Sequence, residues 1–236
     1  MLGADHPARM KLKYFGHSAF LLEIGGVRLA IDPFLKANPH GAVKLTSVAC
    51  EYVLCTHAHE DHICDAAELA KLHGATLVAP FELAEHFAAL GAATIDLMPG
   101  GGIDLPWGRL DMTPATHSSS IEGAHGQNRA MGVASGYLIR AEGRAFYHAG
   151  DTALFGDMRL IGRHGLDVAC VPIGDRYTMG PADAIDALGL LKPRLAIPMH
   201  YNTTEQIRTD PHAFAVAAGQ AGHAVRVMAP GETISP

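Results

Sequence analysis

Four side chains of metal-binding type crowd into six consecutive positions of this chain. The segment EYVLCTHAHEDH runs from an apolar strand into His57, His59, Asp61 and His62. Residues two apart in an extended chain face the same side, so His57 and His59 are predicted to converge on one point. Asp61 and His62 then turn toward a second point as a helix begins. The pattern predicts two neighbouring metal-binding points.

Three further candidate ligands lie far along the chain, each directly after an apolar run. The runs LDMTPATH, RAFYHAGD and RLAIPMH end on His117, Asp151 and His200. In α/β sheets, binding crevices form at the carboxyl ends of the strands. We therefore expect these three residues at the same rim as the crowded segment, so that four strands deliver ligands to one site.

The composition agrees with a metal site and excludes other partners. The chain of 236 residues contains 15 histidines, and histidine is the commonest metal ligand in proteins. A net charge of -6 without a dense run of Lys or Arg argues against binding nucleic acid. No stretch is long and apolar enough to form a transmembrane segment. A small-molecule substrate is the partner that we expect.

The cysteines favour a reducing compartment. Cys50, Cys55, Cys64 and Cys170 show no CxxC pairing and no framework spacing. Residues 1–9 lack the apolar core of a signal peptide and are predicted to form a flexible extension. These features predict reduced thiols in a cytoplasmic enzyme. Cys64 is interpreted as a small buried thiol at the start of a helix, with metal binding as the less favoured alternative.

Strand and helix patterns alternate along the chain. Strands are expected at 11–15, 20–24, 27–31, 52–55 and 76–79, and again near 110–113, 133–140, 145–148, 168–173 and 195–198. Helices are expected at 64–73, 81–90, 155–164, 181–191 and 211–221. A hairpin turn at Gly25-Gly26 makes the first strands antiparallel. Two strand-rich halves, each followed by helices, predict an α/β fold of the αββα sandwich type.

The domain organisation is predicted to be simple. The length falls within the range that one domain fills, and no linker or composition shift separates the halves, so a single domain spans residues 1–236. The stretch 118–131 is rich in Gly, Ser and Asn and carries no strand or helix pattern. Because long irregular loops are usually functional or disordered, we expect this stretch to be a mobile lid over the site.

The motifs together resemble one family. THAHEDH, the later isolated His117, a GD dipeptide at 150–151 and a final PMH resemble the metallo-β-lactamase superfamily over nearly the whole chain. GHSAF, IDPF, YHAGDT, PIGDRYTMGP and PMHYNT are similar to a branch of metal-dependent hydrolases close to ascorbate-phosphate lactonases and N-acylphosphatidylethanolamine-type phospholipases. The resemblance implies a four-layer αββα sandwich of the metallo-β-lactamase type.

The same resemblance implies the roles of the ligands. It assigns His57, His59 and His117 to a first metal ion, and Asp61, His62 and His200 to a second. Asp151 would bridge the two ions, and Asp61 and Asp151 would be the catalytic carboxylates. Three neutral imidazoles leave an open position for water, as a catalytic metal site requires. Two divalent ions are expected, with zinc favoured and manganese or iron also suited to the donors.

Three residues beside the candidate ligands each have two possible roles. Asp32, in the segment AIDPF, matches a carboxylate that such folds keep next to the ligands, where it fixes a histidine tautomer. An Asx-type turn before Pro33 is a compatible alternative. His17 and His148 either point at the site or are structural.

Three residues are candidates for substrate contact. His125 lies in the irregular stretch 118–131, and Arg176 and Tyr177 follow the apolar run VACVPI. A Tyr hydroxyl or an Arg beside two metals would stabilise a developing oxyanion. The alternative for all three is a solvated loop.

The chemistry expected is hydrolysis of a carbonyl or phosphoryl ester, in a lactone, thioester or phosphodiester, by a metal-held hydroxide. Bound metal lowers the pKa of water from 15.7 to about 7. Asp61 would pass a proton. A mononuclear iron oxygenase acting on a thiol or persulfide is the alternative, but it leaves Asp61, His62 and His200 without a clear purpose. A regulatory metal-binding protein is a third hypothesis. The sequence does not assign the physiological substrate or the oligomeric state.

Overall fold

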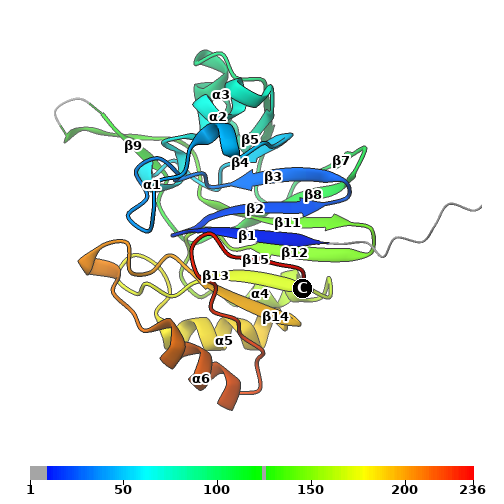
Figure 1. The fold of residues 1–236 in the computed structure, drawn as a ribbon, viewed down its shortest axis with the longest axis vertical. Helices are drawn as coiled ribbons and strands as arrows, with labels where there is room; N and C mark the ends of the chain where they lie inside the picture. Colours follow the sequence, from blue (N-terminus) through cyan, green and yellow to red (C-terminus); the bar gives the residue numbers. More distant parts are fainter. Residues whose placement is uncertain (1–9, 124–125) are drawn as a thin grey trace, which may run out of the picture.

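Two β-sheets pack face to face between two layers of helices in the computed structural model, which describes residues 10–123 and 126–236 (Figure 1). The first sheet has the strand order β15-β1-β2-β3-β4-β5-β6. Its strands are β1 (Lys11–Gly16), β2 (Ala19–Ile24), β3 (Val27–Ile31), β4 (Tyr52–Leu54), β5 (Thr76–Pro80), β6 (Thr94–Leu97) and β15 (Thr233–Ile234). The first and last strands of the described residues thus lie side by side in this sheet.

The second sheet has the order β14-β13-β12-β11-β8-β7. Its strands are β7 (Gly102–Leu105), β8 (Gly108–Pro114), β11 (Ser135–Ala141), β12 (Arg144–His148), β13 (Val168–Pro172) and β14 (Leu195–Met199). The helices are α1 (Glu60–Ile63), α2 (Ala66–His73), α3 (Phe81–Ala89), α4 (Met158–Gly162), α5 (Pro181–Leu191) and α6 (Pro211–Gln220). Figure 1 shows α1 to α3 beside the first sheet and α4 to α6 beside the second. No helix of the described ranges is long and apolar enough to cross a membrane.

Alternating side chains of the first sheet build two separate cores. In β3, Leu29 and Ile31 join the core shared with the second sheet, whereas Ala30 between them faces the core under α2 and α3. Leu54 of β4 faces the shared core and its neighbour Val53 faces the helices. Successive side chains of a strand point to opposite faces, so strands covered on both faces are apolar throughout.

Strand direction brings one end of both sheets to a common rim. β1, β2 and β3 are antiparallel, while β3 to β6 are parallel. In the second sheet β12, β13 and β14 are parallel, and β8 is antiparallel to β11, which is antiparallel to β12. The turn of the β2–β3 hairpin contains Gly25 and Gly26, both with positive φ (60° and 75°), as a tight primed turn requires.

The αββα sandwich predicted from the sequence is confirmed. Each predicted strand and helix lies within a few residues of an observed one, and β3 and α5 match at both ends. The predicted helix at 64–73 corresponds to α2, and the short helix α1 precedes it. The short strands β6, β7 and β15 were not predicted, because they lie at or near sheet edges where half-exposed side chains give no clear alternation.

The prediction of an irregular stretch at 118–131 is wrong. It contains a two-stranded hairpin of β9 (Ser120–Glu122) and β10 (Asn128–Ala130). Ile121 packs against the core under α2 and α3, and Arg129 Nη2 lies 3.2 Å from His86 Nδ1 on α3. These contacts hold the described part of the hairpin on the helices rather than over the site. His125 and residues 1–9, for which we predicted a substrate contact and a flexible extension, lie outside the described residues.

We predict that Tyr137→Phe lowers the free energy of unfolding by about 1–2 kcal/mol. The buried Tyr137 hydroxyl, on β11, lies 2.9 Å from Cys55 O and 3.0 Å from Val78 O and so ties the second sheet to the first. Without it, the two buried carbonyl oxygens lose the one hydroxyl proton that they share, and among the described residues only Val78 O keeps a second donor, the Cys55 N–H (2.9 Å). Denaturant unfolding monitored by circular dichroism measures the change.

Tyr147→Phe is the matched control. Tyr147 is equally buried on the neighbouring strand β12, but its hydroxyl has no hydrogen-bond partner among the described residues. Because this hydroxyl makes no such hydrogen bond, its removal is expected not to lower stability. Equal losses in the two variants would show that the link between the sheets contributes nothing.

Candidate metal centre

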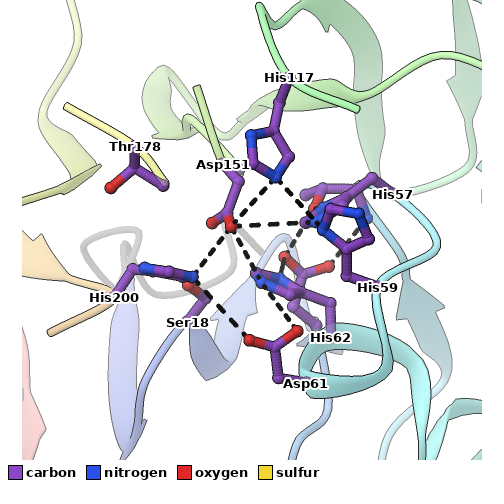
Figure 2. Close-up of polar contacts among 12 residues, drawn as sticks. Ser18, His57, His59, Asp61, His62, His117, Asp151, Thr178 and His200 are labelled. Atoms are coloured by element: carbon purple, nitrogen blue, oxygen red, sulfur yellow. Dashed lines mark hydrogen bonds and ion pairs between the residues drawn. The ribbon is translucent and has the colours of Figure 1, made fainter. Parts of the chain in front are cut away.

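All the ligands predicted from the sequence come together at the common rim (Figure 2). Three of them form one group, in which His57 Nε2 lies 3.0 Å from His59 Nδ1 and His117 Nε2 lies 3.2 Å from the same atom. His57 and His59 follow β4, and His117 follows β8 of the other sheet. The group therefore forms only when both sheets are in place.

A second group gathers beside the first and includes a residue that sequence reasoning had left open. Asp61 and His62 lie on α1, and His200 directly follows β14. His62 Nε2 lies 3.9 Å from Asp61 Oδ1, and His200 Nε2 lies 4.0 Å from Asp61 Oδ2. His17, in the turn between β1 and β2, joins them with its Nε2 2.9 Å from Asp61 Oδ2. The signal for His17 was the GHSAF motif, which alone did not separate a site role from a structural one.

One oxygen of Asp151 lies between the two groups. Its Oδ2 lies 2.9 Å from His200 Nε2 and 3.4 Å from His62 Nε2. It also lies 3.7 Å from His117 Nε2 and 3.9 Å from His57 Nε2. Figure 2 shows the Asp151 carboxylate in the middle of the histidine rings. A single carboxylate oxygen thus faces nitrogen atoms of both groups.

Asp32 orients two of the histidines from behind. Its carboxylate is fully buried, accepts a hydrogen bond from the Thr56 backbone N–H at Oδ1 (2.8 Å), and accepts the Thr56 hydroxyl at Oδ2 (2.7 Å). His62 Nδ1 lies 2.8 Å from the same Oδ2, and His57 Nδ1 lies 3.0 Å from the Thr56 hydroxyl oxygen. Both rings therefore donate from Nδ1 and turn Nε2 toward the site. Sequence reasoning missed Thr56.

Burial and neighbouring charge set the protonation of these groups. Burial lowers the pKa of His57 well below its ordinary value. Burial raises the pKa of Asp151, but His200 and His62 outweigh this effect and hold it well below the usual range. Burial lowers the pKa of His62, but Asp151 and Asp32 outweigh it and raise that pKa well above the ordinary value. The two buried carboxylates therefore stabilise positive charge on the His62 ring.

The donor atoms fit divalent metal ions. His62 Nε2 and Asp151 Oδ1 are buried and have no hydrogen-bond partner among the described residues. The imidazole nitrogens of the first group face one another at 3.0–3.2 Å, where at least one lone pair has no proton to accept. Buried groups of this kind are costly unless a cation or a hydrogen bond compensates them. Imidazole with carboxylate suits zinc, manganese and iron.

Three of the site residues bend the backbone sharply. His17, Asp32 and His200 all have positive φ, at 58°, 45° and 55°. This left-handed conformation is uncommon for residues other than glycine, and it recurs at functional sites where the surrounding structure enforces it. Here the His200 N–H donates to His17 O (2.8 Å), which ties the turn after β1 to the end of β14.

A pocket of about 400 Å³ opens beside the cluster. Its lining residues are His17, His59, Asp61, His117, Ser118, Asp151, Tyr177, His200, Thr203, Thr204 and Ile207. Of the predicted substrate contacts, Tyr177 lines it, whereas Arg176 is exposed and its guanidinium lies 5.5 Å from the centre of the Tyr177 ring. From the stretch 118–131 only Ser118 lines the pocket among the described residues, which gives the predicted lid no support.

Two other candidates lie outside the pocket. His148 is fully buried, with its Nε2 3.0 Å from Ser18 O, and it accepts the Gly150 N–H at Nδ1. Both ring nitrogens are thus engaged away from the ligands, and His148 supports the strand end that carries Asp151. Cys64, a partly buried free thiol, is not among the residues whose donor atoms cluster.

Known proteins share this fold and sequence. A family model described as the beta-lactamase superfamily domain matches residues 11–200. The chain is 66% identical over 225 residues to a UPF0173 metal-dependent hydrolase of Opitutus terrae, covering 95% of this chain and 99% of that one. A relative of the same description from Thermus thermophilus is 44% identical over 226 residues, covering 95% and 98%. A metallo hydrolase from Ignicoccus hospitalis has a similar solved structure, with a TM-score of 0.88, 41% identity, and coverage of 97% and 98%.

We predict that Asp32→Asn lowers metal affinity by about 10- to 100-fold. An amide in place of the carboxylate sets an N–H against donors of Thr56 or His62, so the imidazoles lose the partner that orients them. Competition with a chromophoric chelator measures the affinity. Asp65→Asn is the matched control, because the buried Asp65 carboxylate accepts the Leu35 and Lys36 N–H groups away from the metal ligands. Wild-type affinity in Asp32→Asn would remove Asp32 from the metal centre.

Proposed function

The chain belongs to the beta-lactamase superfamily and is a metal-dependent hydrolase, and from this premise we propose that it cleaves a carbonyl or phosphoryl ester at a centre of two divalent metal ions. Lactones, thioesters and phosphodiesters are the substrate classes proposed. His57, His59 and His117 would hold one ion, and Asp61, His62 and His200 would hold the other.

The position of Asp151 carries this proposal. Its Oδ2 lies within 3.9 Å of nitrogen atoms from both groups, 2.9 Å from His200 Nε2 and 3.9 Å from His57 Nε2. A carboxylate oxygen between two sets of converging donors suits a ligand shared by two cations. A single ion would leave one set of buried donors without compensation.

The donor set favours hydrolysis over redox chemistry at one iron. A mononuclear oxygenase, our alternative from the sequence, needs one group of ligands, and the grouping of Asp61, His62 and His200 would then serve no purpose. Zinc is the ion that we propose, since it prefers imidazole and carboxylate donors and takes no part in redox steps. Manganese and iron suit the same donors.

The residues of the site divide the work of the reaction. When bound, the ions lower the pKa of water toward about 7 and neutralise charge that develops on the substrate oxygen. Asp61 has 43% of its side chain exposed and lines the pocket. Its Oδ2 accepts a hydrogen bond from His17, so we assign the transfer of a proton from water to the leaving oxygen to Oδ1. We assign to Tyr177, which lines the pocket, a hydrogen bond from its hydroxyl to the substrate.

The surroundings proposed for the protein are those of a cytoplasmic enzyme with a small-molecule substrate. All four cysteines are free thiols, three of them buried, which suits a reducing compartment. A pocket of about 400 Å³ falls within the range of small-ligand sites.

We predict that His59→Ala and Asp61→Ala each lose at least one equivalent of metal and lower kcat/KM for a chromogenic phosphodiester or a lactone by about a hundredfold or more. Elemental analysis of protein purified without added metal gives the stoichiometry, with two ions per chain expected for the wild type. His212→Ala, which removes an exposed histidine on α6, is the control and should keep both.

Two results would count against the dinuclear hydrolase. One is a single ion in the fully loaded wild type, with Asp151 turned away from it in an anomalous difference map. The other is near wild-type turnover and full metal content in either alanine variant. Retained folding, checked by circular dichroism, separates loss of ligands from loss of structure.

A further inference from the structure

A chain of hydrogen bonds leads from the second ligand group to the wall of the pocket. His17 Nε2 lies 2.9 Å from Asp61 Oδ2, and His17 Nδ1 lies 2.8 Å from the Thr203 hydroxyl oxygen. The His17 side chain is 1% exposed, and Thr203 lines the pocket. Nothing in the ligand roles described above requires this second bond to Thr203.

The Asp61 carboxylate determines which atom donates in each of these hydrogen bonds. An ionised carboxylate only accepts hydrogen bonds, so His17 donates from Nε2 to Asp61. A neutral imidazole then has a lone pair on Nδ1, and the Thr203 hydroxyl must donate its proton to it. With its only proton engaged, the Thr203 oxygen offers the pocket lone pairs alone. This part of the pocket wall is a hydrogen-bond acceptor.

Backbone contacts hold both members of the chain in place. His17 O accepts the His200 N–H (2.8 Å) and the Tyr14 hydroxyl (3.1 Å). On the other side, the Asn202 N–H donates to Ile207 O (2.9 Å), which closes the loop that carries Thr203. A donor on a bound molecule would therefore meet a preorganised acceptor.

The rest of the pocket disfavours an anionic group on a bound substrate. Among the described residues, no lysine or arginine lines it, and Tyr177 and Ile207 contribute to its lining. A phosphate or carboxylate away from the metal ions would be partly desolvated there without a cationic side chain, which is unfavourable. Small uncharged groups meet no such cost.

We propose that Thr203, oriented by His17, selects substrates that carry a hydroxyl or N–H donor beside the bond to be cleaved and no second anionic group. His17 is a positioning residue in this scheme, and Thr203 determines specificity. The inference rests on the proposed hydrolase function and defines its substrate class more narrowly.

Matched substrates test the inference on the metal-loaded protein. One pair is α-hydroxy-γ-butyrolactone and its methyl ether, and a second is the p-nitrophenyl ester of an α-hydroxy acid and its methyl ether. Each ether keeps the acceptor oxygen and lacks the donor. The wild type should favour the hydroxyl compound in kcat/KM by about five- to tenfold, as one hydrogen bond contributes. A lactone bearing a carboxylate should be the poorest substrate.

Substitutions test whether Thr203 and His17 cause the preference for the hydroxyl compound. Thr203→Val, which is close in shape, should bring the ratio of the two kcat/KM values to about one, and Thr203→Ser should restore it. Thr204→Val alters the next residue of the same wall outside the hydrogen-bond chain, and the ratio should stay as in the wild type. His17→Gln should keep two metal ions per chain by elemental analysis while the ratio falls.

Each contrary outcome has a distinct meaning. Turnover without preference, or a preference unchanged in Thr203→Val, overturns the inference and leaves the hydrolase function standing. A preference for the ethers, or loss of one metal ion in folded His17→Gln, also overturns it, because His17 Nε2 would then be a ligand and Nδ1 would donate to Thr203. No turnover of any compound by the loaded wild type overturns the proposed function and this inference with it.

Discussion

A carboxylate buried away from water has to be surrounded by donors or positive charge, and in this protein the Asp151 carboxylate imposes that demand on the whole rim. Its Oδ2 faces nitrogen atoms that follow strands β4, β8 and β14 and one from α1, so the two sheets and one helix must meet at a single point. Gly150, directly before Asp151, allows the backbone to pass close to Ser135. Gly150 has φ +62° and a Cβ there would lie 2.4 Å from Ser135 O, so a larger residue would displace the carboxylate.

The backbone turns sharply at three strand ends and so brings side chains toward the Asp151 carboxylate. His17, Asp32 and His200 adopt the left-handed conformation where their strands stop, which directs each side chain back toward the rim. Their strain is sustained by buried hydrogen bonds, such as those from the Asp32 carboxylate to Thr56 and the one between the His200 and His17 backbones. The geometry of the site therefore depends on polar contacts behind the candidate ligands as much as on the candidate ligands themselves.

The sequence predicted the layers and the cluster because both depend on residue type. Buried strands are continuous apolar runs, and the candidate ligands are histidines and aspartates at the ends of such runs. The strand β4 and the residues after it could therefore be predicted. The pocket wall was not, since Thr203 and Ile207 are ordinary residues whose role arises only from their position. His17 stayed ambiguous for the same reason, because its partners Asp61 and Thr203 are distant in sequence. The hairpin of β9 and β10 escaped notice because each strand has only three residues.

The backbone bond between His17 and His200 also bears on how the protein is made. One partner is synthesised near the beginning of the chain and the other after β14, so the ribosome must have produced nearly all of the two sheets before the donor set is complete. The histidines that follow β4 emerge long before then, when only part of the coordination sphere exists. Contacts of such sequence separation carry a large loop-closure cost and slow folding. The complete donor set is thus available only once nearly the whole chain has been made, and a nascent chain that ends before His200 presents an incomplete one.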